Sequence, residues 1–110
     1  MNITYFGTNT GPGPQQVRIR HGGGNTTFLK QRIVLHSPDG FQWGYGGSGP
    51  ADLALNMLLD YFVRTHHKRA KDLALDLHQS FKLEFIAWQG EELIVTGNDI
   101  EKWLESGDVL

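Results

Sequence analysis

The sequence contains no cysteine, which excludes disulfide bonds, a thiolate nucleophile and any cysteine-ligated zinc or iron–sulfur site. It also lacks a long apolar run, since no stretch approaches the roughly 18 residues that a membrane-spanning helix needs. Residues 1–7 lack the basic start and apolar centre of a secretory signal peptide. These absences predict a soluble, cytoplasmic protein, and a chain of 110 residues is typical of a single domain spanning residues 1–110.

Positive charge is scarce overall, because the chain has only ten basic residues and twelve acidic ones. The pI of 6.2 is low for a general nucleic-acid-binding domain, which usually has a pI above about 9. Residues 1–51 nevertheless carry a net charge of +3 and residues 52–110 one of −5, and eleven of the 14 glycines lie in the first 49 residues. The basic, glycine-rich half therefore indicates either a small anionic ligand or merely loops in one half and helices in the other.

The first half of the chain predicts a small antiparallel sheet. Period-2 alternation or β-rich composition between glycine and proline breaks is typical of strands. Arg18 and Arg20 alternate with apolar residues and should share one face of their strand. The aromatic residues between Phe41 and Tyr45 should likewise share a face. The four expected strands span residues 3–6, 17–20, 31–36 and 41–45.

A helix should begin near Pro50, because proline suits the first helical position, with Gly49 as its cap. Asp52 then lies where a carboxylate can meet the unpaired N–H groups of the first turn. The helix should run to about residue 65 and be apolar around most of its circumference, so it must be buried on most sides. A second subunit is the expected cover, which predicts a homo-oligomer. Its only polar row is Asn56, Asp60 and Arg64.

The remaining chain predicts one long helix, one strand and one short helix. Residues 68–88 show helical spacing, although residues 81–85 also alternate like a strand, and we expect helix because the longer window fits it. Residues 92–96 should form a strand. Thr96 and Asp99 match a capping box that starts a helix over residues 97–105. The expected fold class is α+β: a small antiparallel N-terminal sheet packed on two longer helices plus a short C-terminal helix.

The segment from Trp43 to Pro50 is the most informative motif. Its four glycines follow a predicted strand and precede a helix, so backbone N–H groups could approach a phosphate or carboxylate. A tight strand-to-helix corner explains the same glycines equally well, and the segment matches neither a Walker loop nor a dinucleotide-binding fingerprint. The candidate ligand-binding residues are Arg18, Arg20, Trp43, Tyr45, Gly46, Gly47, Ser48 and Gly49.

Catalytic and metal-binding signatures are weak. The serine at position 48 does not match the nucleophile elbow Gly-x-Ser-x-Gly, and the basic half offers only one acid before Asp52. His21, His36 and His78 lack a metal-ligand spacing, and the pair at residues 66–67 suits a helix C-terminus. We therefore expect no enzymatic activity, no metal and no cofactor.

From His36 onward the chain resembles a family of short uncharacterised proteins of bacteria and their phages. The resemblance rests on residues 36–55, which contain the motif WGYGGSGPADLAL, and on residues 78–82 and 93–104. It supports a helix over residues 81–82 and implies a phage or mobile-element accessory protein. Small phage proteins of this kind often counter host defences.

Two functions are compatible with these observations. The first is a non-catalytic counter-defence protein that binds and sequesters an anionic nucleotide-type ligand, such as an immune second messenger. The alternative is a protein–protein inhibitor of a bacterial defence complex, similar to an anti-CRISPR protein, with no small ligand. A hydrolase that acts on such a signal is a third class. Neither membrane binding nor general nucleic-acid binding is expected.

Overall fold

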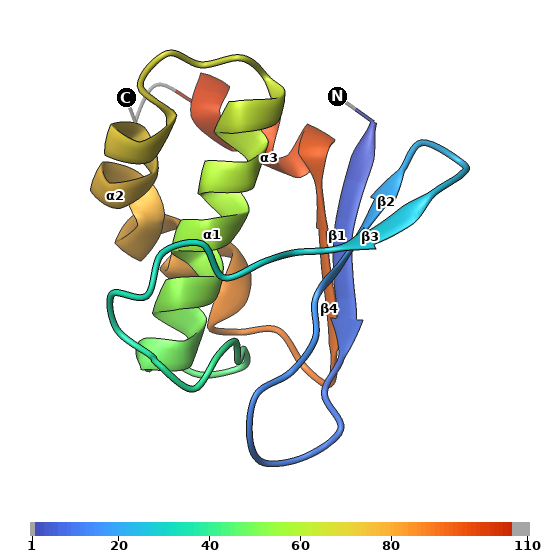
Figure 1. Cartoon of the computed structure of the whole chain (residues 1–110), viewed down its shortest axis with the longest axis vertical. Coiled ribbons are helices and arrows are strands. Elements are labelled where there is room, and N and C mark those ends of the chain that lie inside the picture. Colours follow the sequence, from blue (N-terminus) through green and yellow to red (C-terminus); the bar gives the residue numbers. More distant parts are fainter. Residues whose placement is uncertain (1, 107–110) are drawn as a thin grey trace.

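The computed structural model describes residues 2–106, which form a four-stranded antiparallel sheet covered on one face by helices (Figure 1). The strand order is β3-β2-β1-β4, so β4, from the far end of the chain, lies beside β1. This arrangement confirms the predicted α+β class, with the addition of β3. The strands are β1 (Ile3–Thr8), β2 (Arg18–His21), β3 (Thr26–Phe28) and β4 (Glu92–Thr96).

Alternating side chains give the sheet an inner and an outer face. Tyr5 and Ile19 point inward and are 0% and 1% exposed. Arg18 and Arg20 flank Ile19 on β2 and are exposed on the opposite face. The prediction that both arginines share one face is therefore confirmed, because the period of a strand is two residues.

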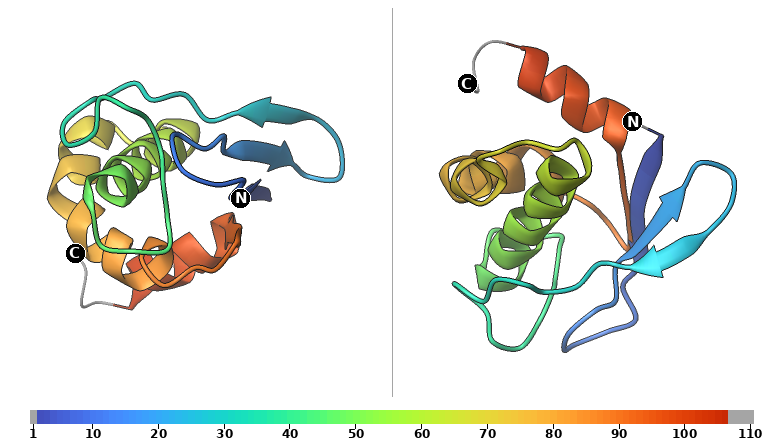
Figure 2. Two further views of the ribbon diagram at one scale, coloured as in Figure 1. Left: turned by 90° about the horizontal axis from the view of Figure 1, so that it is seen from below. Right: turned by 45° about the horizontal axis from the view of Figure 1, so that its top comes forward.

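The long helix α1 (Ser48–Arg64) lies between the sheet and α2 (Ala70–Phe81), as Figures 1 and 2 show. Every residue from Gly49 to Phe62 is buried within this single chain. Other parts of the same chain cover the apolar surface of α1, for which a second subunit was the expected cover. The burial of α1 therefore gives no support to the predicted homo-oligomer.

The segment 29–37, which we call the strap, crosses α1 without forming a strand, so the strand predicted over residues 31–36 is wrong. Side chains of α1 take the place of a strand partner. Asn56 Oδ1 accepts the backbone N–H groups of Arg32 and Ile33 at 2.7 and 3.0 Å. The Asp52 carboxylate accepts the backbone N–H groups of Leu35, His36 and Ser37 at 2.9–3.2 Å.

The strand predicted over residues 41–45 is also wrong. Phe41 forms one isolated bridge with Gln15, and Gly44 then adopts a φ of +89°, which ends any extended run. The following helix begins at Ser48 with Gly47 as its cap, two residues before the expected start at Pro50. The polar row predicted on α1 is present, but Asp52 binds the strap and not the first turn of its own helix.

The C-terminal predictions are confirmed. α2 continues into the π-helix η1 (Lys82–Ile86), so residues 81–85 are helical and not extended. Thr96 and Asp99 form the capping box, each side chain accepting the other residue's backbone N–H at 3.0 Å. α3 (Gly97–Glu105) follows directly, with the predicted bounds.

Candidate functional site

The outer face of the sheet carries a row of registered side chains that crosses all four strands. Phe28 on β3 pairs with Arg18 on β2, Arg18 pairs with Phe6 on β1, and Phe6 pairs with Ile94 on β4. The Arg18 guanidinium lies 5.2 Å from the centre of the Phe28 ring. The Arg20 guanidinium lies 4.9 Å from the centre of the Phe6 ring. Both cations are therefore held over aromatic rings on an exposed surface.

Neither arginine is neutralised within residues 2–106, where no carboxylate forms an ion pair with Arg18 or Arg20. The apolar members of the row are also open to solvent, since Phe28 is 53% and Ile94 is 58% exposed. This face combines unpaired positive charge with aromatic and aliphatic surface. Guanidinium groups bind phosphate oxygens through two parallel hydrogen bonds, so the face is chemically suited to an anion that carries a ring.

A cavity of about 610 Å³ opens beside this row, and Arg18 and Phe6 contribute to its lining. The loop between β1 and β2 supplies another wall, and the buried side chain of Gln15 holds that loop together. Gln15 Oε1 accepts from the backbone N–H of Thr10 at 2.8 Å, and its Nε2 donates to the carbonyls of Gly11 and Gly13 at 2.8 and 3.1 Å. These three hydrogen bonds fix the shape of this wall.

The glycine-rich segment is built as a corner. A Cβ on Gly44 would lie 2.9 Å from the carbonyl oxygen of Gln89, and one on Gly49 would lie 2.8 Å from Gln42 Cβ. A Cβ on Gly47 would overlap the ring of Tyr45. Gly44 and Gly49 therefore have structural reasons, whereas Gly47 meets only the movable ring of half-exposed Tyr45 and a Cβ on Gly46 would meet open space.

The aromatic residues of the same segment differ in burial. Trp43 is 2% exposed and its indole N–H donates to the carbonyl of Gly90 at 3.0 Å, so its ring is part of the core. Only its margin borders a second cavity of about 550 Å³. Tyr45 is 50% exposed. The shared face predicted for these aromatics fails at Tyr45, because the backbone turns at Gly44, whereas Phe41 is buried like Trp43.

The eight predicted ligand-binding residues do not gather at one place. Arg18 and Arg20 lie on the outer face of the sheet, while the start of α1, with Ser48 and its neighbouring glycines, lies on the inner side (Figure 1). None of residues 43–49 lines the cavity beside Arg18. Sequence reasoning also missed Phe6 and Phe28 as partners of the arginines. Their alternation within short strands was visible, but the strand pairing was not.

Gly44→Ala is expected to lower the free energy of unfolding by about 1–3 kcal/mol, because alanine is strained at this positive φ and its Cβ meets a backbone oxygen. Gly46→Ala should change it by less than about 0.5 kcal/mol, since the added Cβ meets no atom. Thermal unfolding of both variants measures the contrast. Equal melting temperatures for Gly44→Ala and the parent would contradict the structural reading. Loss of ligand binding by a stable Gly46→Ala variant would instead identify the loop as a cradle.

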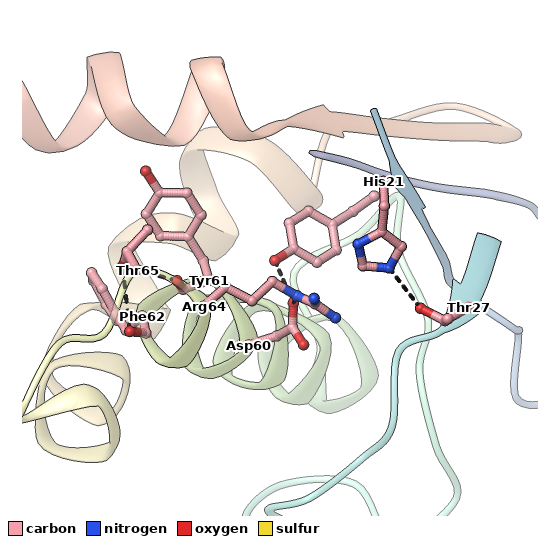
Figure 3. Close-up of polar contacts among 8 residues, drawn as sticks. His21, Thr27, Asp60, Tyr61, Phe62, Arg64 and Thr65 are labelled. Atoms are coloured by element: carbon pink, nitrogen blue, oxygen red, sulfur yellow. Dashed lines mark hydrogen bonds and ion pairs between the residues drawn. The ribbon is translucent and has the colours of Figure 1, made fainter. Parts of the chain in front are cut away.

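A buried polar group lies on the inner side of the sheet. The Tyr5 hydroxyl donates to Asp60 Oδ2 at 2.7 Å, and Arg64 Nε donates to the same oxygen at 2.6 Å; Figure 3 shows Arg64 reaching back to Asp60. Burial, together with the Asp60 carboxylate, raises the pKa of Tyr5 far above its usual value, so its phenol remains a donor. The hydrogen bond to Asp60 raises the pKa of Arg64. Because Tyr5 is fully buried, this group fastens β1 to α1.

His36 and His78, two histidines that were not expected to bind a metal, lie in contact with each other. His36 Nε2 and His78 Nε2 are 3.0 Å apart, while the ring centroids are 5.2 Å apart, so the rings point at each other end to end. His78 Nδ1 lies 2.7 Å from the carbonyl of Leu75, which leaves its Nε2 as the acceptor for the Nε2–H of His36. This N–H···N bond joins the strap to α2. Within residues 2–106 no three potential metal-ligating side chains of His, Cys, Asp or Glu cluster.

These features define a small α+β domain with an open, arginine-bearing sheet face. The chain belongs to DUF6166, a family of unknown function, whose model matches residues 5–106. The match includes most of β1 and all of β2 and β3, and these strands precede the residues on which the resemblance in the sequence rests. Comparison with curated proteins and with solved structures gives no match. In the described part of the chain, no helix has the length and apolarity needed to cross a bilayer.

Proposed function

We propose that the protein binds and sequesters an anionic nucleotide-type ligand on the outer face of its sheet, without altering it chemically. The resemblance to phage proteins suggests the setting, in which the ligand is an immune second messenger in the cytoplasm of an infected bacterium. The predicted homo-oligomer stays a prediction, and light scattering at micromolar concentration decides between it and a 12.4 kDa monomer.

The observation that carries this proposal is the row in which Arg18 lies between Phe28 and Phe6, with Arg20 over Phe6. A base can stack on an aromatic ring or on a guanidinium plane, and each stacked base contributes about 1–3 kcal/mol to binding. The same guanidinium groups supply charge for phosphate. The cavity beside Arg18 offers the ligand a concave binding surface.

A binding role without catalysis is supported by the residues that line this cavity. They include no His, Asp, Glu, Lys or Tyr, the side chains that most often act as general acids and bases. The Glu92 carboxylate accepts from the hydroxyl of Thr8, one of the lining residues. A single carboxylate without a second acid–base group does not assemble a hydrolytic pair.

A second candidate function, inhibition of a defence complex through protein–protein contact, is favoured by a different surface. Leu83 on η1 and Trp88 just beyond it are each 67% exposed. Tryptophan is among the residues that most often dominate the binding energy at protein interfaces, so Trp88 is the residue that carries this candidate. This surface contains no arginine of the sheet face, so substitutions can test the two functions separately.

Incubation with a panel of cyclic and linear nucleotides, followed by heat release and chromatography, separates the possibilities. Recovery of an intact nucleotide supports sequestration. Recovery of an altered nucleotide indicates an enzyme and contradicts the proposal. No uptake of any nucleotide also contradicts it and leaves the protein–protein inhibitor as the better candidate.

Arg18→Ala and Arg20→Ala are each expected to weaken binding of a nucleotide retained in that panel by about 10- to 150-fold, the effect of losing a charge-assisted contact of about 1.5–3 kcal/mol. Stability should fall by less than about 1 kcal/mol, because the arginines are exposed and lose only a surface cation–π contact. Titration calorimetry and thermal unfolding measure the two effects. Arg69→Ala, at the start of α2 and away from the sheet, is the matched control. Parental affinity in both sheet variants would show that the face is merely a solvated surface.

A further inference from the structure

The outer face of the sheet carries charge of opposite sign on its two sides. Arg18 and Arg20 belong to β2, whereas Glu92 belongs to β4, and β1 lies between these strands. Glu92 pairs in register with Thr8, next to the row that contains Phe6. Strands lie about 4.8 Å apart and residues two apart on one strand about 6.7 Å apart, so the Cα atoms of Arg18 and Glu92 are separated by about 12 Å.

Phe6 and Ile94, the registered pair of β1 and β4 in the neighbouring row, supply apolar surface next to these charges, and the Arg20 guanidinium lies over the Phe6 ring. A nucleoside phosphate has the same polarity, with a hydrogen-bonding base edge at one end and a phosphate at the other. A phosphate bound at the arginines directs the base across β1 and toward Glu92. The reverse orientation is unfavourable, because it would place the phosphate against the carboxylate.

The carboxylate of Glu92 is positioned by its neighbour. The Thr8 hydroxyl lies 3.0 and 2.9 Å from the two Glu92 oxygens, so it faces the middle of the carboxylate group. One hydroxyl proton satisfies only one of the available lone pairs. Both oxygens therefore keep acceptor capacity, and an ionised carboxylate offers acceptors alone.

The pattern of two adjacent acceptors distinguishes between the bases. Guanine presents two neighbouring donors, N1–H and the 2-amino group, which match both oxygens of a carboxylate. Adenine and cytosine each place an amino group beside a ring nitrogen acceptor, and uracil places one N–H between two carbonyls. In these three bases an acceptor would face the carboxylate, and an unmatched acceptor pair is costly.

We infer that Glu92 reads the base of the ligand and that the sheet face selects a guanosine phosphate, with Arg18 and Arg20 on the phosphate. This inference rests on the proposed function and adds the identity of the base to it. The shared chemistry is the guanosine phosphate group, whether it occurs as a mononucleotide or within a cyclic dinucleotide.

The test is calorimetric titration of the full chain with the 5′-monophosphates of guanosine, inosine, adenosine, cytidine and uridine, and with the cyclic dinucleotide of guanosine. Binding of GMP is expected to be about 10-fold tighter than that of AMP, CMP or UMP, the lower end of the range for a bidentate base contact, because Glu92 is exposed. IMP lacks the 2-amino group and should lie between GMP and AMP. The cyclic dinucleotide shows whether a second guanosine adds affinity.

Glu92→Gln should reduce the preference for GMP over AMP to less than about 3-fold, through weaker binding of GMP and equal or tighter binding of AMP, because an amide offers one acceptor and one donor and so matches the amino group and ring nitrogen of adenine. Glu91→Gln is the matched control. It removes the same charge one residue away, where the side chain borders the second cavity. That variant should retain the parental preference.

The outcomes separate this inference from the proposed function. Equal affinity for all the monophosphates would leave the proposed function standing and overturn the role of Glu92. An equal loss of affinity for every base in Glu92→Gln would also overturn it. Failure of every nucleotide to bind at millimolar concentration would reject the proposed function itself.

Discussion

Asp52→Ala is expected to lower the free energy of unfolding by about 3–5 kcal/mol, because each buried donor that loses its acceptor costs about 1–3 kcal/mol. The Asp52 side chain is fully buried, and it accepts three backbone N–H groups of the strap and the side-chain amide of Gln31. Alanine leaves these donors without their acceptor. Because small domains are stable by only about 5–15 kcal/mol, this loss removes a large part of the total.

Chemical denaturation and thermal melting measure this effect, and a melting temperature lower by about 12 °C or more is expected for a domain of this size. Asp72→Ala is the matched control: its carboxylate is 64% exposed and lies 3.6 Å from Arg69, so its removal should cost less than about 1 kcal/mol. Asp52→Asn tests the polarity of the site, since an amide would direct an N–H toward the strap donors and should also be destabilising. A melting temperature of Asp52→Ala close to that of the parent would show that α1 does not hold the strap.

Trp43→Ala is expected to destabilise the protein by about 3–5 kcal/mol, the usual cost of emptying a large aromatic site in a core. The side chain is 2% exposed, and its indole N–H is bonded to the carbonyl of Gly90, which joins the corner before α1 to the loop before β4. Tyr45→Ala should cost less than about 1 kcal/mol, because half of the tyrosine is exposed.

Thermal unfolding of the two variants therefore separates residues that the sequence analysis placed together in one ligand-binding set. Trp43→Phe gives a further comparison, since it keeps most of the apolar volume and removes the N–H. It should lie between the parent and Trp43→Ala. A stable Trp43→Ala variant that lost only nucleotide affinity would contradict the assignment of Trp43 to the core and return it to the ligand site.

Local sequence patterns were sufficient wherever the stabilising contacts are close in the chain. The capping box of Thr96 and Asp99 involves residues three apart, and the start of α3 follows from it. The alternation around Ile19 places Arg18 and Arg20 on one face without knowledge of any other strand. The apolar circumference of α1 likewise showed that this helix is buried, because hydrophobic surface must be removed from water.

The tertiary structure decided what covers these elements and which residues meet. β-Rich residues 31–36 remain irregular because Asp52 and Asn56, about 20 residues further on, satisfy the backbone of the strap. The outer-face row joins Phe6 to Ile94 across 88 positions of sequence, and only the strand order β3-β2-β1-β4 brings them together. The sequence by itself determined the residue types, the helices and the shared face of the arginines. The aromatic partners of those arginines and the cavity beside them depend on non-local strand pairing, which no local periodicity specifies.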